Sequence, residues 1–320
     1  CDDAADESED AIRYARELGI VQTVCVVSSD EVVDLLVVVV SACGEPFGEF
    51  SLFPTLLVYR IARRNYTVML SGDGGDELFW GYAQHFGGVM NGVGDFRYPR
   101  LWRKMKQKVR RMLRSPKVDP GHRFNSIGEW HRSNYSRLPE ASLHRIFPRM
   151  PGWPDEYGYF NYMGHDPDDA AQWLRQSEFA SHLGGILLKV DRASMFSSLE
   201  VRVPLLDREV IDVAVQLDWR FFFDPVKRIG KIPLRKSLAR YVSYQTSEKK
   251  GFAPPMGKWL RDSLRPAVED VLLTRDSLAG VEVDKKAMRA LYQEHIEGRD
   301  YGWGLWPLLS LALWEQHYGR

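Results

Sequence analysis

A glycine- and aspartate-rich heptapeptide that directly follows a short apolar run constrains the fold more than any other segment. The run is Val68 to Leu70, and the heptapeptide is Ser71-Gly72-Asp73-Gly74-Gly75-Asp76-Glu77. Glycines let the backbone approach a ligand closely, and a helix start after them supplies N–H groups suited to phosphate. Its three carboxylates repel one another unless a cation lies among them, and Mg²⁺ on a polyphosphate meets that need. Since open α/β sheets bind ligands at the carboxyl ends of strands, we predict a nucleotide site there.

A tight Gly/Asp turn is the alternative interpretation of this heptapeptide, because Gly-Asp-Gly alone is weak evidence for a site. The continuation Leu78-Phe79-Trp80-Gly81-Tyr82 makes the functional interpretation much stronger.

The first third of the chain alternates helical and strand-like patterns. Apolar residues at helical spacing predict helices over Glu7 to Leu18 and Pro54 to Arg64, with another helix starting near Ser29. The β-branched run Val21 to Val27 predicts a buried strand in one sheet with the run before the heptapeptide. We therefore expect an α/β class, with a helix-covered parallel sheet in residues 1–90, an irregular and helical connection in 91–170 and a helical part in 171–320.

Composition limits the function classes. The 43 basic and 43 acidic residues cancel, so no global field recruits nucleic acid or a membrane. The longest aliphatic run, Leu35 to Val40, is too short to span a bilayer. Three cysteines (Cys1, Cys25 and Cys43) form neither a disulfide framework nor a zinc pattern, so a reducing, cytoplasmic location is the default expectation.

The segment Arg100 to Arg114 combines eight basic residues with an apolar stripe at helical spacing. It is either an anion or nucleic-acid patch or a surface helix with a solvated basic face. The neutral chain favours the surface helix.

Two further segments carry clustered charge. One runs from Leu188 to Asp207, and the other holds Lys231-Ile232-Pro233-Leu234-Arg235 followed by Lys249-Lys250-Gly251-Phe252. In the first, opposite charges lie close in sequence, and we expect them to pair and to tie helices around a site. These pairs are Asp191 with Arg192, Glu200 with Arg202, and Asp207 with Arg208. An ammonium such as Lys249 or Lys250 would stabilise a transition state that gathers negative charge.

In order and spacing, these motifs resemble the C-terminal synthetase domain of the glutamine-dependent asparagine synthetases. The resemblance covers nearly the whole chain and implies an adenine-nucleotide α-hydrolase-like (ATP pyrophosphatase) domain followed by a mainly helical remainder. It implies that aspartate attacks ATP to give β-aspartyl-adenylate, and that ammonia then releases AMP and asparagine. It also implies a glutaminase domain in the full protein as the source of ammonia from glutamine, and it leaves a homodimer open.

The resemblance assigns roles to the heptapeptide and to one lysine. Asp76 is the expected Mg²⁺ ligand, with Glu77 in support. Asp73 faces the acyl-adenylate, and Lys249 stabilises the developing charge on phosphorus. Nucleotide contacts fall to Ser71, Gly72, Gly74 and Gly75.

The chain also departs from the family pattern. The Ser-Gly-Gly-x-Asp-Ser pyrophosphate loop is missing, Gly44 stands where the family usually shows Asp, and Ser247 replaces a frequent arginine. We therefore expect this chain alone not to form aspartyl-adenylate. One rival hypothesis is a related enzyme that acts on another carboxylate, for example one that closes β-lactams or lasso peptides or that amidates sugars. The other is a non-catalytic partner subunit.

Overall fold

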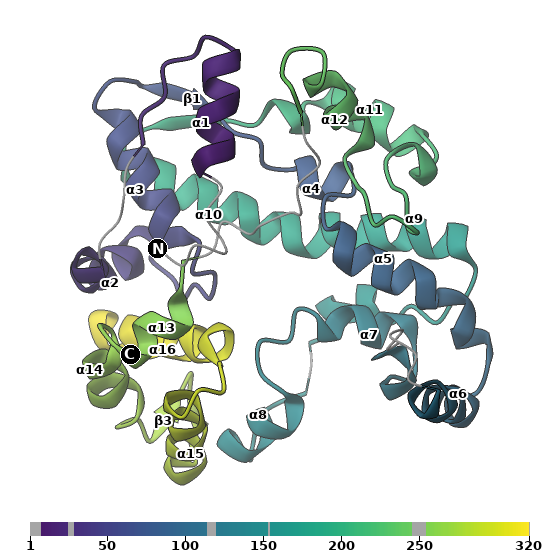
Figure 1. The fold of residues 1–320 in the computed structure, drawn as a ribbon. Helices are drawn as coiled ribbons and strands as arrows, with labels where there is room; N and C mark the ends of the chain where they lie inside the picture. The colour runs from purple at the N-terminus through teal and green to yellow at the C-terminus, as the bar shows by residue number, and fades with distance from the viewer. Residues whose placement is uncertain (1–7, 25–28, 114–119, 153, 245–253, 320) are drawn as a thin grey trace.

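The computed structural model describes residues 8–24, 29–113, 120–152, 154–244 and 254–319. It is mainly helical and contains a small parallel sheet, which confirms the α/β class in its coarser form (Figure 1). The elements of the first third are α1 (Ser8–Glu17), α2 (Ser29–Cys43), α3 (Leu52–Arg63), β1 (Val68–Leu70) and α4 (Gly75–Leu78).

The helices predicted in this first third are confirmed. α1 ends before Gly19, whose φ of +66° is the left-handed conformation that glycine adopts most easily. α2 begins at Ser29, as expected, and α3 carries Pro54 in its first turn, where the missing N–H costs nothing.

The strand predicted over Val21 to Val27 is wrong where the structure describes it. Residues 21–24 have no regular secondary structure, and Val21 is 96% exposed. The remainder of that prediction lies outside the described residues. A β-branched run forms a strand only where a neighbouring strand offers its free hydrogen-bonding edge, so propensity alone does not decide the outcome.

β1 pairs instead with β2 (Glu200–Arg202), which lies far along the chain. The two strands are parallel, with Val68 opposite Glu200 and Leu70 opposite Arg202. Parallel neighbours need a long crossover connection, and here it runs from α4 through all the described helices that precede β2. Because both strands run the same way, the segments after Leu70 and after Arg202 leave from the same edge.

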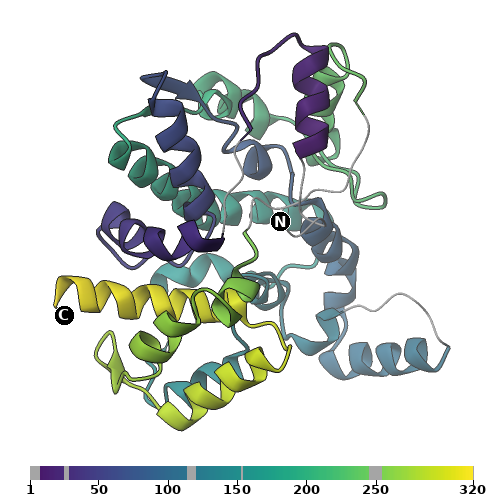
Figure 2. The same ribbon diagram turned by 60° about the vertical axis from the view of Figure 1, so that its left-hand side comes forward.

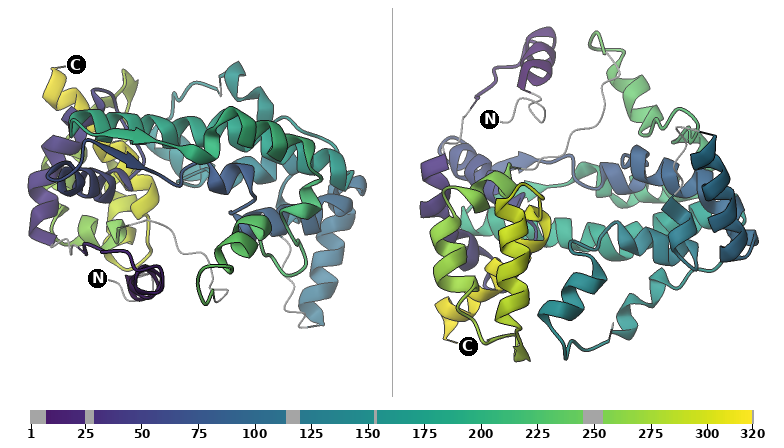
Figure 3. Two further views of the ribbon diagram at one scale, coloured as in Figure 1. Left: turned by 90° about the horizontal axis from the view of Figure 1, so that it is seen from above. Right: turned by 60° about the horizontal axis from the view of Figure 1, so that its bottom comes forward.

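One long helical rod leads into β2. It consists of α9 (Pro167–Ser177), a π-helical turn η5 (Glu178–His182) and α10 (Leu183–Phe196) in continuous succession. Seen from above, the rod spans the molecule between the C-terminal helices and the region of α6 (Figure 3). Single π turns inside helices are frequent at functional sites, since they redirect side chains.

The segment from 91 to 170 contains more helix than the sequence suggests. Its described elements are α5 (Ala83–Gly92), η2 (Val93–Arg97), α6 (Arg100–Met112), η3 (Pro120–Arg123), α7 (Ile127–Ser133), α8 (Glu140–Ile146) and η4 (Asp155–Phe160). α6 confirms the helix expected from the basic segment, and it lies at the periphery of the molecule (Figure 2).

The C-terminal third is helical, as expected, apart from a two-stranded antiparallel ribbon. After β2 come η6 (Pro204–Leu206), α11 (Arg208–Gln216), η7 (Trp219–Phe221), α12 (Ile232–Leu238), α13 (Met256–Arg261), α14 (Arg265–Ala267), η8 (Val268–Leu272), β3 (Ser277–Leu278), β4 (Val281–Glu282), α15 (Lys285–Ile296) and α16 (Gly302–Tyr318). No helix of the described part is long and apolar enough to cross a bilayer.

Two apolar clusters join segments that are distant in sequence. The first packs α2 and α3 against α10 and the C-terminal helices, with Phe53 edge-on to Trp306 at 5.0 Å between ring centres. The second surrounds Trp80, which stacks on Phe223 at 5.4 Å, and links α4 and α5 to α9 and α11. The second cluster lies directly behind the glycine-rich loop, so it fixes the position of that loop.

Replacing Phe53 by alanine should destabilise the fold by about 3–5 kcal/mol, the usual loss for a buried phenylalanine. Phe53 is 1% exposed, whereas Phe221 is 53% exposed and serves as a control of the same residue type. We expect Phe221→Ala to cost less than about 1 kcal/mol in the same urea-unfolding measurement. Equal losses for the two variants would contradict the packing of α3 against the C-terminal helices.

Candidate functional site

The glycine-rich loop begins as a continuation of the sheet. The backbone N–H of Ser71 donates to the carbonyl of Arg202 at 2.8 Å, one residue beyond the β1–β2 ladder. The Ser71 hydroxyl then donates to the carboxylate of Asp73, which holds that side chain over the turn. Gly74 follows with φ of +80°, and α4 starts at Gly75. The expected strand, loop and helix start are therefore present in that order.

Two glycines of the loop are needed because η6 packs against them. A Cβ atom at Gly74 would lie 2.3 Å from Leu206 Cδ2, and one at Gly75 would lie 2.8 Å from Leu205 Cδ1. Gly72 differs, since nothing lies within 4 Å of where its Cβ would be. The loop is thus clamped on its Gly74–Gly75 side and open at Gly72.

Asp76 forms an ion pair with a lysine from the third motif. Its Oδ1 lies 2.9 Å from Lys231 Nζ, and the two side chains are 24% and 29% exposed. Gly81 allows the pair to form, because a Cβ there would lie 1.7 Å from Asp76 Oδ1 and 2.4 Å from Lys231 Cε. An ammonium therefore supplies part of the positive charge that the carboxylates of this loop require.

Backbone contacts hold Lys231 in this position. It has φ of +54°, and its N–H donates to the carbonyl of Phe79 at 2.7 Å. Its neighbour Gly230 must lack a side chain, since a Cβ would lie 1.7 Å from the Trp80 carbonyl oxygen. Arg235 closes the turn by donating from Nε to the Gly230 carbonyl at 2.8 Å. The third motif is thus attached to the residues just after the loop.

Glu77 points away from Asp76 into the interior. It is 2% exposed, and the hydroxyl of Tyr82 donates to its Oε1. Burial raises the pKa of the Glu77 carboxyl, while the Tyr82 hydrogen bond opposes that shift. Glu77 and Tyr82 thus connect α4 to the residues just after it; the supporting role expected for Glu77 stays a prediction.

A hydrogen-bonded network continues from Glu77 through the π turn. His182 Nδ1 lies 4.0 Å from Glu77 Oε1 and 3.2 Å from Glu178 Oε2. Glu178 also accepts a hydrogen bond from Tyr135 and lies 3.3 Å from His131 Nε2. Burial lowers the pKa of His131 well below its usual value, so this imidazole is neutral. The network ties α4 to η5 and α7.

Among the described residues, His85, His131 and Glu178 form a group of three potential metal ligands whose ligand atoms lie within 4.8 Å of one another. However, His85 Nε2 lies only 2.8 Å from His131 Nδ1, a normal hydrogen-bond distance. Two nitrogen ligands on one tetrahedral Zn²⁺, each about 2.0–2.1 Å from the metal, would be about 3.3 Å apart. We therefore interpret this group as part of the buried network.

Hard oxygen donors suitable for Mg²⁺ are found at the loop instead. Asp73 and Asp76 are half-buried carboxylates beside the exposed Gly72. Mg²⁺ binds through one or two carboxylates together with substrate phosphates, so these residues fit it.

Of the three charge pairs expected from the sequence, one forms and two do not. Arg192 pairs with Glu45, 3.5 Å away, and not with Asp191, which is exposed. Glu200 and Arg202 do pair, at 2.8 Å, because residues two apart on a strand share a face. Both are more than half exposed, so the pair contributes little to stability.

The third expected pair is also wrong. Asp207 instead caps α11 by accepting the N–H of Glu209 at 2.9 Å, and Arg208 lies 3.7 Å from Asp212. Lys249 and Lys250 lie outside the described residues.

Lys231 is the site residue whose role the sequence did not reveal. It was noticed as part of a motif, but nothing in its spacing related it to Asp76. The available signal was a pair of glycines: Gly81 lies between Trp80 and Tyr82, and Gly230 directly precedes Lys231.

Substituting Gly81 by alanine should force Asp76 and Lys231 apart and destabilise the protein by about 1–3 kcal/mol, as overpacking does. Gly72→Ala is the matched control, since its added methyl group meets open space. Thermal unfolding of both variants checks this, and a Gly81→Ala protein as stable as Gly72→Ala would show that the pair is not packed against Gly81.

Similarity to known proteins agrees with these motifs. The family model named Asparagine synthase matches residues 2–316. Proteins from Mycobacterium tuberculosis and Mycobacterium bovis, both named "putative asparagine synthetase (glutamine-hydrolyzing)", are 32% identical over 96% of this chain and 48% of their own length. Asparagine synthetase (glutamine-hydrolyzing) 1 of Bacillus subtilis is 25% identical over 96% of this chain and 49% of its own.

No solved structure matches the chain significantly. The chain spans about half the length of the curated relatives it matches. With a family match over residues 2–316, and with the glycine-rich loop, the segment after β2 and Lys231 gathered at one sheet edge, the chain belongs to the asparagine synthase family.

Proposed function

We propose that the complete protein is an ATP-dependent ligase that converts aspartate to asparagine through β-aspartyl-adenylate, with ammonia released from glutamine by a glutaminase domain. The observation that supports this most is the meeting of three sequence-distant motifs at the carboxyl edge of β1 and β2. Family membership supports amide synthesis in general, and the names of the relatives favour aspartate as the acceptor. The β1–loop–α4 unit is then of the ATP pyrophosphatase type.

ATP would bind where the loop is open. Gly72 is exposed and leaves room for a ligand, so Ser71 and Gly72 would contact the nucleotide. Gly74 and Gly75 would act indirectly, by allowing η6 to pack beneath the loop. Asp73, held by the Ser71 hydroxyl, would face the acyl-adenylate.

Asp76 and Asp73 would hold Mg²⁺, which when bound neutralises charge on the phosphates. Lys231 would act on the same carboxylate, holding Asp76 in one orientation. Lys249 would stabilise the charge that develops on phosphorus during adenylation and on oxygen during amidation. In this scheme the protein positions groups and neutralises charge, with little acid–base chemistry of its own.

The experiment is aspartate-dependent ATP–pyrophosphate exchange by the complete protein. Asp76→Asn should lower exchange by roughly 10²-fold or more, because a preorganised charged group is lost. Lys249→Ala should mainly lower turnover, with little change in the Michaelis constant for ATP. Asp270→Asn, at an exposed position in η8, is the control for loss of one carboxylate and should leave exchange unchanged.

Two outcomes would contradict the proposal. Exchange that depends on a different carboxylate, and not on aspartate, would replace the substrate while keeping the chemistry. Exchange equal to wild type in Asp76→Asn would leave the loop as a structural turn.

A further inference from the structure

α6 presents its apolar side to solvent. The residues of this stripe are 41–76% exposed, and they are Leu101, Trp102, Met105, Val109 and Met112. The side that faces the body is polar: Arg103 and Gln107 are 5% and 3% exposed. Arg103 donates to the carbonyl of Gly121 at 2.7 Å and lies 4.0 Å from the Phe96 ring centre. The neutral chain predicts a solvated basic face for this helix, but in the structure the apolar stripe is exposed as well.

Cations flank the stripe on both sides. Arg100, Lys104 and Lys108 recur at four-residue spacing along one flank and are exposed, while Lys106 and Arg110 lie on the other. Lys106 is paired with Asp95 at 2.7 Å. A basic border on each side of an outward apolar stripe is the pattern of helices that lie in a membrane interface.

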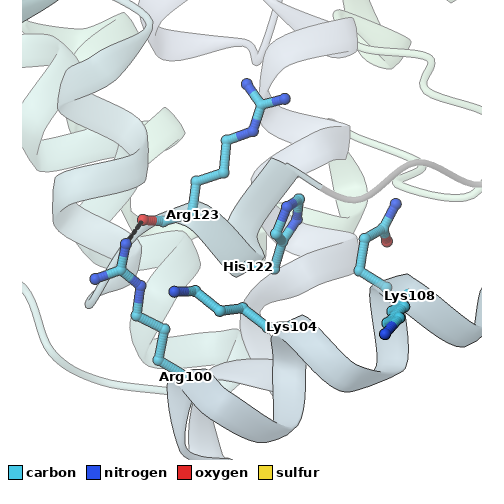
Figure 4. Close-up of a pocket in the computed structure, with 6 residues that line it drawn as sticks. Arg100, Lys104, Lys108, His122 and Arg123 are labelled. Carbon is cyan, nitrogen blue, oxygen red and sulfur yellow. Dashed lines mark hydrogen bonds between the residues drawn. The ribbon is translucent and has the colours of Figure 1, made fainter.

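A cationic pocket adjoins the first flank. It has a volume of about 560 Å³ and is lined by Arg100, Lys104, Gln107, Lys108, His122 and Arg123. Figure 4 shows Lys104 extending from α6 below His122 of η3, with Lys108 further along the same helix. Among the described residues no aspartate or glutamate lines this pocket, and the side-chain nitrogen and oxygen of the buried Gln107 have no hydrogen-bond partner there. Such a pocket is suited to a phosphate group.

The same features select among possible occupants. A second copy of α6 would bring like charges together along both borders, which is unfavourable. A partner groove that wraps the helix would collide with the body, because the Arg103 side is occupied by η3. A flat anionic surface reaches the stripe and both borders together, and α6 lies at the edge of the molecule where such a surface can approach (Figure 2).

We propose that α6 docks the protein on anionic lipid bilayers. Its apolar stripe enters the interface, and the cationic border and the pocket bind lipid phosphates. The attraction adds up over several cations near the surface and weakens as salt screens it. This inference is independent of the proposed ligase activity, since no residue of the loop takes part.

Vesicle co-sedimentation of the chain tests the proposal, with phosphatidylcholine alone and with roughly one third phosphatidylserine. We expect binding to the anionic vesicles that is at least about tenfold stronger than to the neutral ones and that falls in high salt. Lys104→Glu with Lys108→Glu should lower the affinity for anionic vesicles at least about tenfold. Leu101→Gln with Met105→Gln should also weaken it, about tenfold, because apolar burial is lost.

The matched control is Lys258→Glu with Lys286→Glu, which reverses two exposed lysines of α13 and α15, helices on the opposite side of the molecule from α6 (Figure 1). This control should bind like wild type, and circular dichroism should show all variants folded. Equal loss in the control would indicate nonspecific attraction and overturn the proposal. It would also be overturned by absence of vesicle binding, including the case in which inorganic phosphate or an acidic protein alone is bound.

Discussion

Parallel pairing between two three-residue strands is the constraint on which the rest of the site depends. β1 and β2 align Val68 with Glu200 and Leu70 with Arg202, so the loop after one strand and η6 after the other leave the sheet side by side. A shift of the register by one residue would turn the side chains of a strand to the opposite face and separate Gly74 and Gly75 from the leucines beneath them. The long rod α9–η5–α10 delivers β2 to this position, and the buried network around Glu178 fixes the rod to the loop.

Close approach of two backbone segments then positions Lys231 of the third motif beside the loop. Because Gly81 and Gly230 have no side chains, residues 230–231 can pack on residues 79–81. Lys231 reaches Asp76 as a result. The pair is partly exposed, so its contribution to stability is modest. The pair matters for orientation: the Lys231 ammonium holds the Asp76 carboxylate, which we propose binds Mg²⁺, in one direction.

Local patterns in the sequence predicted local structure well. Helical spacing located α1, α2, α3 and α6, and the apolar run at Val68 located β1 with the loop after it. Pairing between distant segments could not be predicted from the sequence. The residues of Val21 to Val24 and of Glu200 to Arg202 do not indicate which segment lies beside β1. Neighbouring opposite charges were a poor guide, as Arg192 and Asp207 show, because backbone caps and distant carboxylates compete for the same groups. The outward stripe of α6 was hidden for a related reason: periodicity identifies an apolar face but not the direction in which the fold points it.

The central claim is that Asp76 and Lys231 interact across the junction of the first and third motifs. A double-mutant cycle on urea unfolding, with Asp76→Asn, Lys231→Met and the double variant, measures this most directly. The account predicts a coupling free energy of about 1 kcal/mol that decreases at high salt. Single-variant losses that add to the double-variant loss within about 0.3 kcal/mol would show that the two groups do not interact, and would contradict it.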